Sequence, residues 1–191
     1  MRAGGASELM LIRHAPALDG GRLAGRRDVA ADLSGAAALA GLRDAVGDVA
    51  VVASPALRCR QTAGALWPGV APQLDPRLWE QDFGSWEGMA YADLPDLGDL
   101  TARDLAAHRP PGGESFADLC ARVAPALETA AGLGGRVAVV AHAGVVRAAL
   151  ARATGAVPGA LAFQVAPLSL TRILALPGGA WAVAEVNRVF A

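Results

Sequence analysis

Three runs of apolar residues mark this chain, and each of them stops at polar side chains. The runs cover residues 9–12, 49–55 and 136–142. Apolar residues at successive positions over a short run are typical of a strand that is buried on both faces of a sheet. The pattern therefore predicts three strands in the core of the protein.

Helical patterns of apolar residues lie between and after these runs. They cover residues 33–46, 56–66, 114–133 and 144–153. We expect Ser34 to cap the first helix, because a serine hydroxyl can accept a hydrogen bond from the first turn. Strands that alternate with helices predict an α/β fold, here a three-layer α/β/α sandwich around a mixed, mostly parallel central sheet.

The last part of the chain alternates apolar and polar residues on both sides of Pro177, Gly178 and Gly179. This pattern predicts a β-hairpin over residues 169–189. With 191 residues and no internal repeat or linker, the chain is expected to form a single domain over residues 1–191.

A long stretch in the middle of the chain has no regular pattern. Residues 70–90 look irregular, and residues 91–114 predict short helices and a loop that ends in Arg-Pro-Pro-Gly-Gly. Long segments of this kind are usually functional. We therefore expect the segment of about 79–113 to be an insertion over the active site.

Composition and charge limit the class of partner. Hydrophobic residues make up 53% of the chain and the formal net charge is -1, so neither a disordered chain nor a broadly basic nucleic-acid surface is expected. All 17 basic residues are arginine. A phosphate site in this chain must therefore use guanidinium groups, and a P-loop, which requires lysine, is excluded.

The sequence also predicts a soluble protein of the cytoplasm. Cys59 and Cys120 are the only cysteines and lack the spacing of a disulfide framework. The apolar stretch near the N-terminus is too short for a signal peptide. The longest apolar candidate for a membrane span, residues 137–153, is interrupted by three basic or ionisable side chains.

Polar side chains of one chemical kind follow all three predicted strands. Arg13 and His14 follow the first, Arg58 lies one turn into the helix after the second, and His142 follows the third, just before Gly144. Ligands of α/β sheets bind beyond the carboxyl ends of the strands. Each residue alone is compatible with an ordinary polar strand end, but the joint placement favours an anion pocket suited to a phosphoryl group, next to a helix N-terminus.

Four motifs of the chain, in this order, resemble those of one known family. They read LIRHA, ASPALRCRQTA, EQDFGSWEG and VVAHAGVVRAAL, and they extend from about residue 9 to residue 150. The chain resembles the histidine phosphatase superfamily, which has the phosphoglycerate mutase-like fold. The short length and the RPPGGES stretch are most similar to the small phosphatase branch, in particular to α-ribazole phosphatase.

The resemblance implies a role for five residues. His14 would be the nucleophile that becomes phosphohistidine, and Arg13 and Arg58 would clamp the phosphate. His142 would form hydrogen bonds with the transferring phosphoryl oxygens. Glu80 would donate the proton to the leaving group, whereas the spacing of the acidic residues alone does not choose between it and its neighbours.

Other charged residues of the same region have two readings each. Asp82 and Glu87 are either structural or competing acids, and Glu114 is expected to begin the helix that follows it. His108 is expected at the surface or in the insertion, with a substrate contact as the alternative. A second set, Arg22, Arg26 and Arg27, either lies at the pocket rim and binds a second anionic part of the substrate or belongs to a solvated loop.

The chain departs from the family pattern at Ala15, where a glycine normally follows the Arg-His pair. The added Cβ could interfere if this position needed a positive φ or a close approach of the phosphate. The substrate contacts that the family makes after this motif are also missing.

No metal or other cofactor is expected, because the sequence has no His-Glu-x-x-His motif and no cluster of Cys and His.

The resemblance implies a metal-independent phosphatase of a small-molecule phosphate ester, with α-ribazole 5′-phosphate as one substrate. Two alternatives stay open, a phosphoglycerate mutase-type transfer and a phospho-ligand binder without catalysis. No nucleic-acid or membrane partner is expected. The oligomeric state is not fixed by the sequence, and a homodimer is one option.

Overall fold

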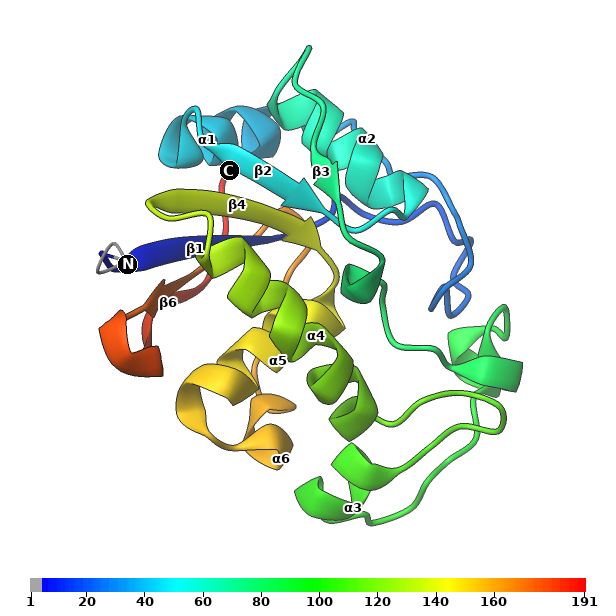
Figure 1. The fold of residues 1–191 in the computed structure, drawn as a ribbon. Coiled ribbons are helices and arrows are strands. Elements are labelled where there is room, and N and C mark those ends of the chain that lie inside the picture. Colours follow the sequence, from blue (N-terminus) through cyan, green and yellow to red (C-terminus); the bar gives the residue numbers. More distant parts are fainter. Residues whose placement is uncertain (1–4) are drawn as a thin grey trace.

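A six-stranded sheet forms the centre of the protein, with helices on both of its faces (Figure 1). The computed structural model describes residues 5–191; residues 1–4, which belong to the predicted single domain and to the N-terminal stretch discussed above, lie outside the described residues. The strands are β1 (Ser7–Arg13), β2 (Ala50–Ala53), β3 (Gln73–Leu74), β4 (Arg136–Ala141), β5 (Leu170–Ala175) and β6 (Trp181–Arg188). The helices are α1 (Ala36–Val46), α2 (Leu57–Leu66), α3 (Ala102–Ala107), α4 (Phe116–Ala131), α5 (Ala143–Thr154) and α6 (Val157–Ala160).

The order of strands in the sheet is β3-β2-β4-β1-β5-β6. The pairs β3·β2, β2·β4 and β4·β1 are parallel, whereas β5 pairs antiparallel with both β1 and β6. This confirms the predicted mixed, mostly parallel sheet, and the antiparallel β5·β6 pair is the predicted terminal hairpin.

Two apolar layers fill the space between the sheet and the helices. Leu9, Leu11 and Val139 point to the face covered by α4 and α5, where a large buried cluster forms. Met10 and Ile12, which alternate with them along β1, belong to the second cluster under α1 and α2. Because successive side chains of a strand point to opposite faces, the continuous apolar run of β1 supplies both layers. The three-layer α/β/α prediction is confirmed.

The first helix begins differently from the prediction. Its N-cap is Gly35, and no side chain caps it. Ser34 is instead part of the preceding turn, where its backbone N–H donates to the Asp32 carboxylate at 2.9 Å. The serine was therefore the wrong cap, because an aspartate two residues earlier binds the backbone first.

Two short elements were not predicted. β3 has two residues, both exposed, so no apolar pattern marks it. α6 has four residues and begins with Val157 and Pro158. Elements of this length carry too few positions for a periodic pattern. Over residues 5–191, no helix is long and apolar enough to cross a membrane.

Candidate active site

The register of the sheet brings three strand ends together. Arg13, the last residue of β1, pairs with Ala141, the last residue of β4, and Ala53 of β2 pairs with Val140. The next residues along the chain are therefore neighbours at one edge of the sheet. Figure 1 shows that the arrowheads of these parallel strands point to the side where the segment of about 79–113 lies.

His14 follows β1 directly and is almost fully buried. Its Nδ1 lies 2.6 Å from the carbonyl oxygen of Ala15, which can only accept, so Nδ1 carries the proton. The Nε2 atom is then unprotonated, and it faces the Nε–H of Arg58 at 3.2 Å. Burial lowers the pKa of His14 to about 3; the contact with Ala15 opposes the shift and the charge of Arg58 adds to it. His14 is therefore a neutral imidazole with a lone pair on Nε2.

Arg58 lies in the first turn of α2 and is 1% exposed. Its Nη2 donates to the carbonyl oxygen of Gly25 at 2.7 Å, and its Nη1 donates to that of Arg27 at 2.9 Å. Nη2 also lies 3.1 Å from Nδ1 of His142. One planar guanidinium thus contacts both histidines while two carbonyl groups fix its orientation.

His142 is the N-cap residue of α5 and is fully buried. Since Arg58 can only donate, Nδ1 of His142 is the acceptor, and Nε2 donates to the hydroxyl of Ser54 at 2.9 Å. The ring is stacked on Trp79 and meets His14 edge to face, with ring centroids 5.1 Å apart for the two histidines. Burial, followed by the nearby His14, lowers the pKa of His142, so this imidazole is also neutral.

Glu80 reaches the same edge of the sheet from the irregular segment. One carboxylate oxygen accepts from the backbone N–H of Gly144 at 3.4 Å, and the other accepts from the N–H of Gln81 at 2.9 Å. A Cβ at position 144 would lie 2.2 Å from the Glu80 carboxylate. The carboxylate therefore sits at the N-terminus of α5, in a space that a glycine leaves open.

These residues surround a cavity of about 250 Å³. Arg13, His14, Arg58 and Glu80 all line it, so the structure brings four of the five residues of the expected catalytic set to one cavity. His142 lies behind them, against Arg58 and Ser54. The arrangement can hold a tetrahedral anion between guanidinium groups, next to an unprotonated imidazole nitrogen and a carboxylate.

Arg13 is held by the loop that precedes β5. Its Nη1 donates to the carbonyl oxygen of Val165 at 2.6 Å, and its Nε is buried without a partner among the described residues. Burial lowers the pKa of Arg13, and the Glu80 carboxylate opposes that shift. The guanidinium therefore faces the cavity with donors that the protein does not fully use.

The structure separates Glu80 from the two other acidic residues of its segment. Asp82 accepts from the N–H of Gly84 at 2.8 Å and pairs with Arg26. Glu87 accepts from the N–H groups of Arg26 and Phe83, so it joins two loops. Neither is among the residues that line the cavity. Position favours Glu80 as the acid.

The two loop arginines predicted at the pocket rim have other partners. Arg26 forms ion pairs with Asp82 at 3.5 Å and with Glu114 at 3.3 Å. Arg22 donates to the carbonyl oxygen of Gly88 at 2.9 Å and is exposed. Neither lines the cavity described above. A substrate contact by Arg22 or Arg26 stays a prediction without support from their placement.

Glu114 does not begin the helix, contrary to the prediction. Ser115 is the N-cap of α4 and forms a capping box with Asp118. The Glu114 carboxylate instead pairs with Arg26 and Arg122. The serine next to it offers the shorter side chain that N-capping requires, which leaves the glutamate free to join the ion-pair cluster.

His108 lies in the insertion and is half-buried. Its ring is stacked on Trp86, with centroids 5.4 Å apart, and its Nε2 is buried without a partner among residues 5–191. It does not line the cavity that holds His14.

Ala15 fits the structure without strain. It is fully buried, and among the described residues only Leu168 and Asn187 combine a side chain with a positive φ. Its N–H donates to the hydroxyl of Thr62 at 3.0 Å. The methyl group thus occupies a core position, and the backbone at this site does not need a glycine.

Arg147 is the residue that the sequence analysis missed. It lies one turn into α5 and lines the same cavity as Arg13 and His14. Its signal in the sequence is a charged residue within a mostly apolar helix, five positions after His142. In the sequence, this charge indicates only that residues 137–153 do not form a membrane span.

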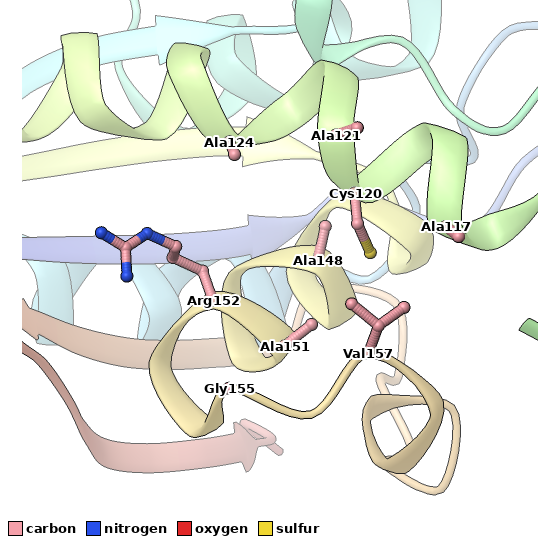
Figure 2. A pocket seen from close by; sticks show the side chains of 9 residues that line it. All are labelled: Ala117, Cys120, Ala121, Ala124, Ala148, Ala151, Arg152, Gly155 and Val157. Carbon is pink, nitrogen blue, oxygen red and sulfur yellow. The ribbon is translucent and has the colours of Figure 1, made fainter. Parts of the chain in front are cut away.

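A second hollow, of about 400 Å³, lies between α4, α5 and the start of α6 (Figure 2). Alanines line most of it, and Figure 2 shows Cys120 and Val157 facing each other across it while Arg152 extends away. Burial raises the pKa of Cys120 to about 11, so the thiol is neutral. Arg152 is engaged with Trp181 and Glu128. This hollow lacks the chemistry of the first cavity.

Within the part of the chain that the structure describes, no group of three or more His, Cys, Asp or Glu residues could hold a metal ion.

Comparison with known proteins gives a family and several similar folds. The model of the family described as "Histidine phosphatase superfamily (branch 1)" matches residues 9–189. A protein of Mycobacterium tuberculosis named as a bifunctional protein is 39% identical over 88 residues, which are 40% of this chain. The chain covers 22% of the length of the curated relatives it matches.

Solved structures are similar over nearly the whole chain. Mycobacterial hydrolase 1 is 26% identical with a TM-score of 0.84, covering 96% of this chain and 99% of that one. A mycobacterial glucosyl-3-phosphoglycerate phosphatase, solved with VO3, is 25% identical with a TM-score of 0.78, covering 94% and 98%. A candidate alpha-ribazole-5′-P phosphatase of Escherichia coli K-12 is 23% identical with a TM-score of 0.81, covering 96% and 97%, and this likeness concerns the fold.

Proposed function

Because the chain belongs to the histidine phosphatase superfamily, we propose that it hydrolyses phosphate monoesters of small molecules through a phosphohistidine at His14. One observation carries the proposal. The proton of His14 is held on Nδ1 by Ala15, which leaves the Nε2 lone pair facing Arg58 at the edge of an arginine-lined cavity. A neutral imidazole nitrogen is a competent nucleophile near neutral pH.

In the first step, Nε2 of His14 attacks phosphorus and the bond from phosphorus to the ester oxygen breaks. Arg13 and Arg58 hold the equatorial phosphoryl oxygens. The Nε–H of Arg58, which donates to Nε2 of His14 in the free protein, donates to a phosphoryl oxygen instead. Glu80, in its protonated form, gives its proton to the leaving alkoxide. The product alcohol departs, and phosphohistidine and a Glu80 carboxylate remain.

In the second step, water attacks phosphorus and the bond from phosphorus to Nε2 breaks. The Glu80 carboxylate accepts the proton of that water, so it returns to its starting form. Inorganic phosphate leaves and His14 regains its lone pair. His142 supports both steps by holding Arg58 through Nδ1, while Ser54 fixes its ring.

We propose that guanidinium groups neutralise the phosphoryl charge in place of a metal ion, since three arginines line the cavity. Hydrolysis that persists after extensive treatment with a chelator supports this, and restoration of activity only by an added divalent cation contradicts it.

The test of the function is a phosphoenzyme experiment. Wild-type protein is mixed with a ³²P-labelled monoester and quenched at alkaline pH, where phosphohistidine survives. We expect label on the wild type, no label on His14→Asn, and no turnover by that variant. Labelled but hydrolytically inert protein that isomerises phosphoglycerates would indicate a mutase instead. Tight phosphate binding without label or turnover would indicate a binding protein.

Rates of hydrolysis of phosphoglycerates, sugar phosphates, phosphoserine and α-ribazole 5′-phosphate would identify the natural substrate. The last compound enters because of the sequence resemblance to α-ribazole phosphatase. Its support from the solved Escherichia coli structure is limited to the fold.

A further inference from the structure

Arg147 lies between the catalytic cavity and an adjoining cavity, which is not the hollow of Figure 2. It lines the cavity of about 250 Å³ that holds His14, and also an adjoining cavity of about 350 Å³. Arg13 lines both as well. The remaining lining of the adjoining cavity comes from Gln164, Val165 and Ala166. Two guanidinium groups and one amide are thus the polar side chains around this space.

One loop sets the orientation of both arginines. The carbonyl oxygen of Phe163 accepts from Nε of Arg147 at 2.9 Å, and that of Val165 accepts from Nη1 of Arg13 at 2.6 Å. Each guanidinium has five N–H donors in a fixed plane. The two anchors use one donor group of each arginine, so among residues 5–191 the other donors of both side chains have no hydrogen-bond partner.

The positive charge of these two side chains is not neutralised by ion pairs. Among residues 5–191, neither Arg13 nor Arg147 forms an ion pair with a carboxylate, whereas Arg26, Arg122 and Arg172 do. Arg147 is close enough to lower the pKa of Arg13 by charge repulsion. The carboxylates of Asp19 and Glu80 line the catalytic cavity but not the adjoining one.

We propose that the adjoining cavity binds a second anionic group of the substrate, a carboxylate or a second phosphate, through Arg147 and Gln164. The proposal rests on the proposed phosphatase function and names its substrate class: a small phosphate monoester whose leaving group carries an oxyanion. Arg58 and Arg13 take the phosphoryl group, and Arg147 takes the oxyanion across the space that Arg13 shares. An anion there relieves the repulsion between two like charges and meets donors arranged for bidentate binding.

The proposal also selects among the compounds of the screen. Phosphoglycerates carry a carboxylate, whereas α-ribazole 5′-phosphate has no second anionic group, so it is expected to be the poorer substrate. The sequence predicted that Arg22 and Arg26 bind the second anionic group. In the present proposal Arg147 of α5 binds it instead.

The test compares matched substrates. 3-Phosphoglycerate and glycerol 3-phosphate differ in a carboxylate against a hydroxymethyl group, and propane-1,3-diol bisphosphate and monophosphate differ in the second phosphate. In at least one pair, we expect the wild-type protein to prefer the compound with the second anionic group by about 10-fold or more in kcat/KM. This is the usual contribution of a charge-assisted hydrogen bond. The pair that shows the preference identifies the second group.

The variants assign that preference to the cavity. In Arg147→Gln the preference should fall to about 2-fold or less, mostly through KM. Gln164 is exposed, so Gln164→Leu is not expected to disturb folding and should weaken the preference by several-fold. Arg152→Gln, on the same helix but outside both cavities, should keep the wild-type ratio.

Two results overturn the proposal: no preference in either pair by the wild type, or a preference that survives in both Arg147→Gln and Gln164→Leu. p-Nitrophenyl phosphate has one anionic group. Its hydrolysis distinguishes failure of the second anion site from failure of the proposed phosphatase function. If the wild type hydrolyses it without any anion preference in the two pairs, only the second anion site is wrong. If the wild type hydrolyses none of the five compounds, the proposed function is wrong.

Discussion

Arg58 places its Nε–H 3.2 Å from Nε2 of His14, on the nitrogen whose lone pair faces the cavity. The same guanidinium is held in plane by the carbonyl groups of Gly25 and Arg27 and contacts His142. No carboxylate within residues 5–191 pairs with this buried cation, and such an arrangement is costly unless the site is built for an incoming anion. The proposed nucleophile and its phosphate clamp are thus one hydrogen-bonded unit.

We predict that Arg58→Lys lowers kcat/KM for a phosphate monoester by about 10²–10³-fold, the usual effect of removing a preorganised donor. A lysine has one ammonium group and cannot reach two carbonyl groups and two histidines at once. Steady-state kinetics measure the change. Arg60→Lys, two residues further along α2 and exposed, is the matched control and should retain wild-type activity. Wild-type kinetics in Arg58→Lys would contradict the role of the planar group.

The sequence could predict the positions of Arg58, His14 and His142 for a physical reason. The apolar runs that precede them are core strands, and residues after parallel strands necessarily meet at one sheet edge. Glu80 needed the family resemblance, because its segment has no regular pattern and holds several acids. The geometry then distinguishes it, since Asp82 and Glu87 bind backbone N–H groups of nearby loops.

The partners of the charged loop residues could not be predicted, because they are far apart in sequence. Arg26 meets Glu114 across 88 positions, and the Arg147 anchor depends on where the Phe163 carbonyl group falls. Such pairs depend on loop paths, which the hydrophobic pattern does not determine. The substrate contact expected of Arg22 and Arg26 therefore stays a prediction, while Arg147 of α5, which lines the cavity, was overlooked.

Gly144→Ala should separate activity from stability. The new Cβ would lie 2.2 Å from the Glu80 carboxylate, which must move, and 3.2 Å from Cδ2 of Leu119. A displaced proton donor should lower kcat by about 10–10²-fold. The helix itself gains about 0.5–1 kcal/mol from alanine, and the crowding against Glu80 and Leu119 opposes this gain. We therefore expect little change in Tm.

The control for that variant is Gly64→Ala. Gly64 lies in α2, and no atom is close enough to its Cβ position to be displaced. This variant should gain stability from the same helix preference and keep wild-type kcat. A Gly144→Ala protein with full activity would show that the position of the Glu80 carboxylate is not important.

The low pKa of His14 makes stability depend on pH. In the folded protein His14 stays neutral down to about pH 3, whereas in the unfolded chain a histidine binds a proton below its ordinary value of 6.5. Between these values the unfolded state binds more protons, so the free energy of unfolding falls as the pH falls. At about pH 5 the loss from this one group is about 2 kcal/mol, at about 1.36 kcal/mol per pKa unit.

Urea denaturation at about pH 5 and about pH 7.5 measures this effect. The difference in unfolding free energy between the two pH values should be smaller in His14→Asn than in wild type by roughly 2 kcal/mol. Titrating groups that do not contact His14 contribute equally to both proteins and cancel in the comparison. Equal differences in the two proteins would mean that His14 is not held neutral by its surroundings.

Arg122 holds the backbone that carries Glu80. Its Nη1 donates to the carbonyl oxygens of Arg77 at 2.7 Å and Trp79 at 3.1 Å, and its Nη2 donates to that of Glu80 at 3.2 Å. It also pairs with the carboxylate of Glu114. One α4 side chain thus fixes three carbonyl groups along the chain leading to the proposed acid, without lining the catalytic cavity itself.

We predict that Arg122→Met lowers hydrolysis of an alkyl phosphate by about 10-fold or more, but that of p-nitrophenyl phosphate much less, because a misplaced acid matters only when the leaving group needs a proton. Glu80→Gln should show the same selectivity more strongly, since it removes the acid itself. Arg77→Met, which removes a neighbouring ion pair with Asp75, should slow both substrates equally or not at all. An equal loss on both substrates in Arg122→Met would instead indicate a general loss of folding, because only a displaced Glu80 distinguishes the two leaving groups.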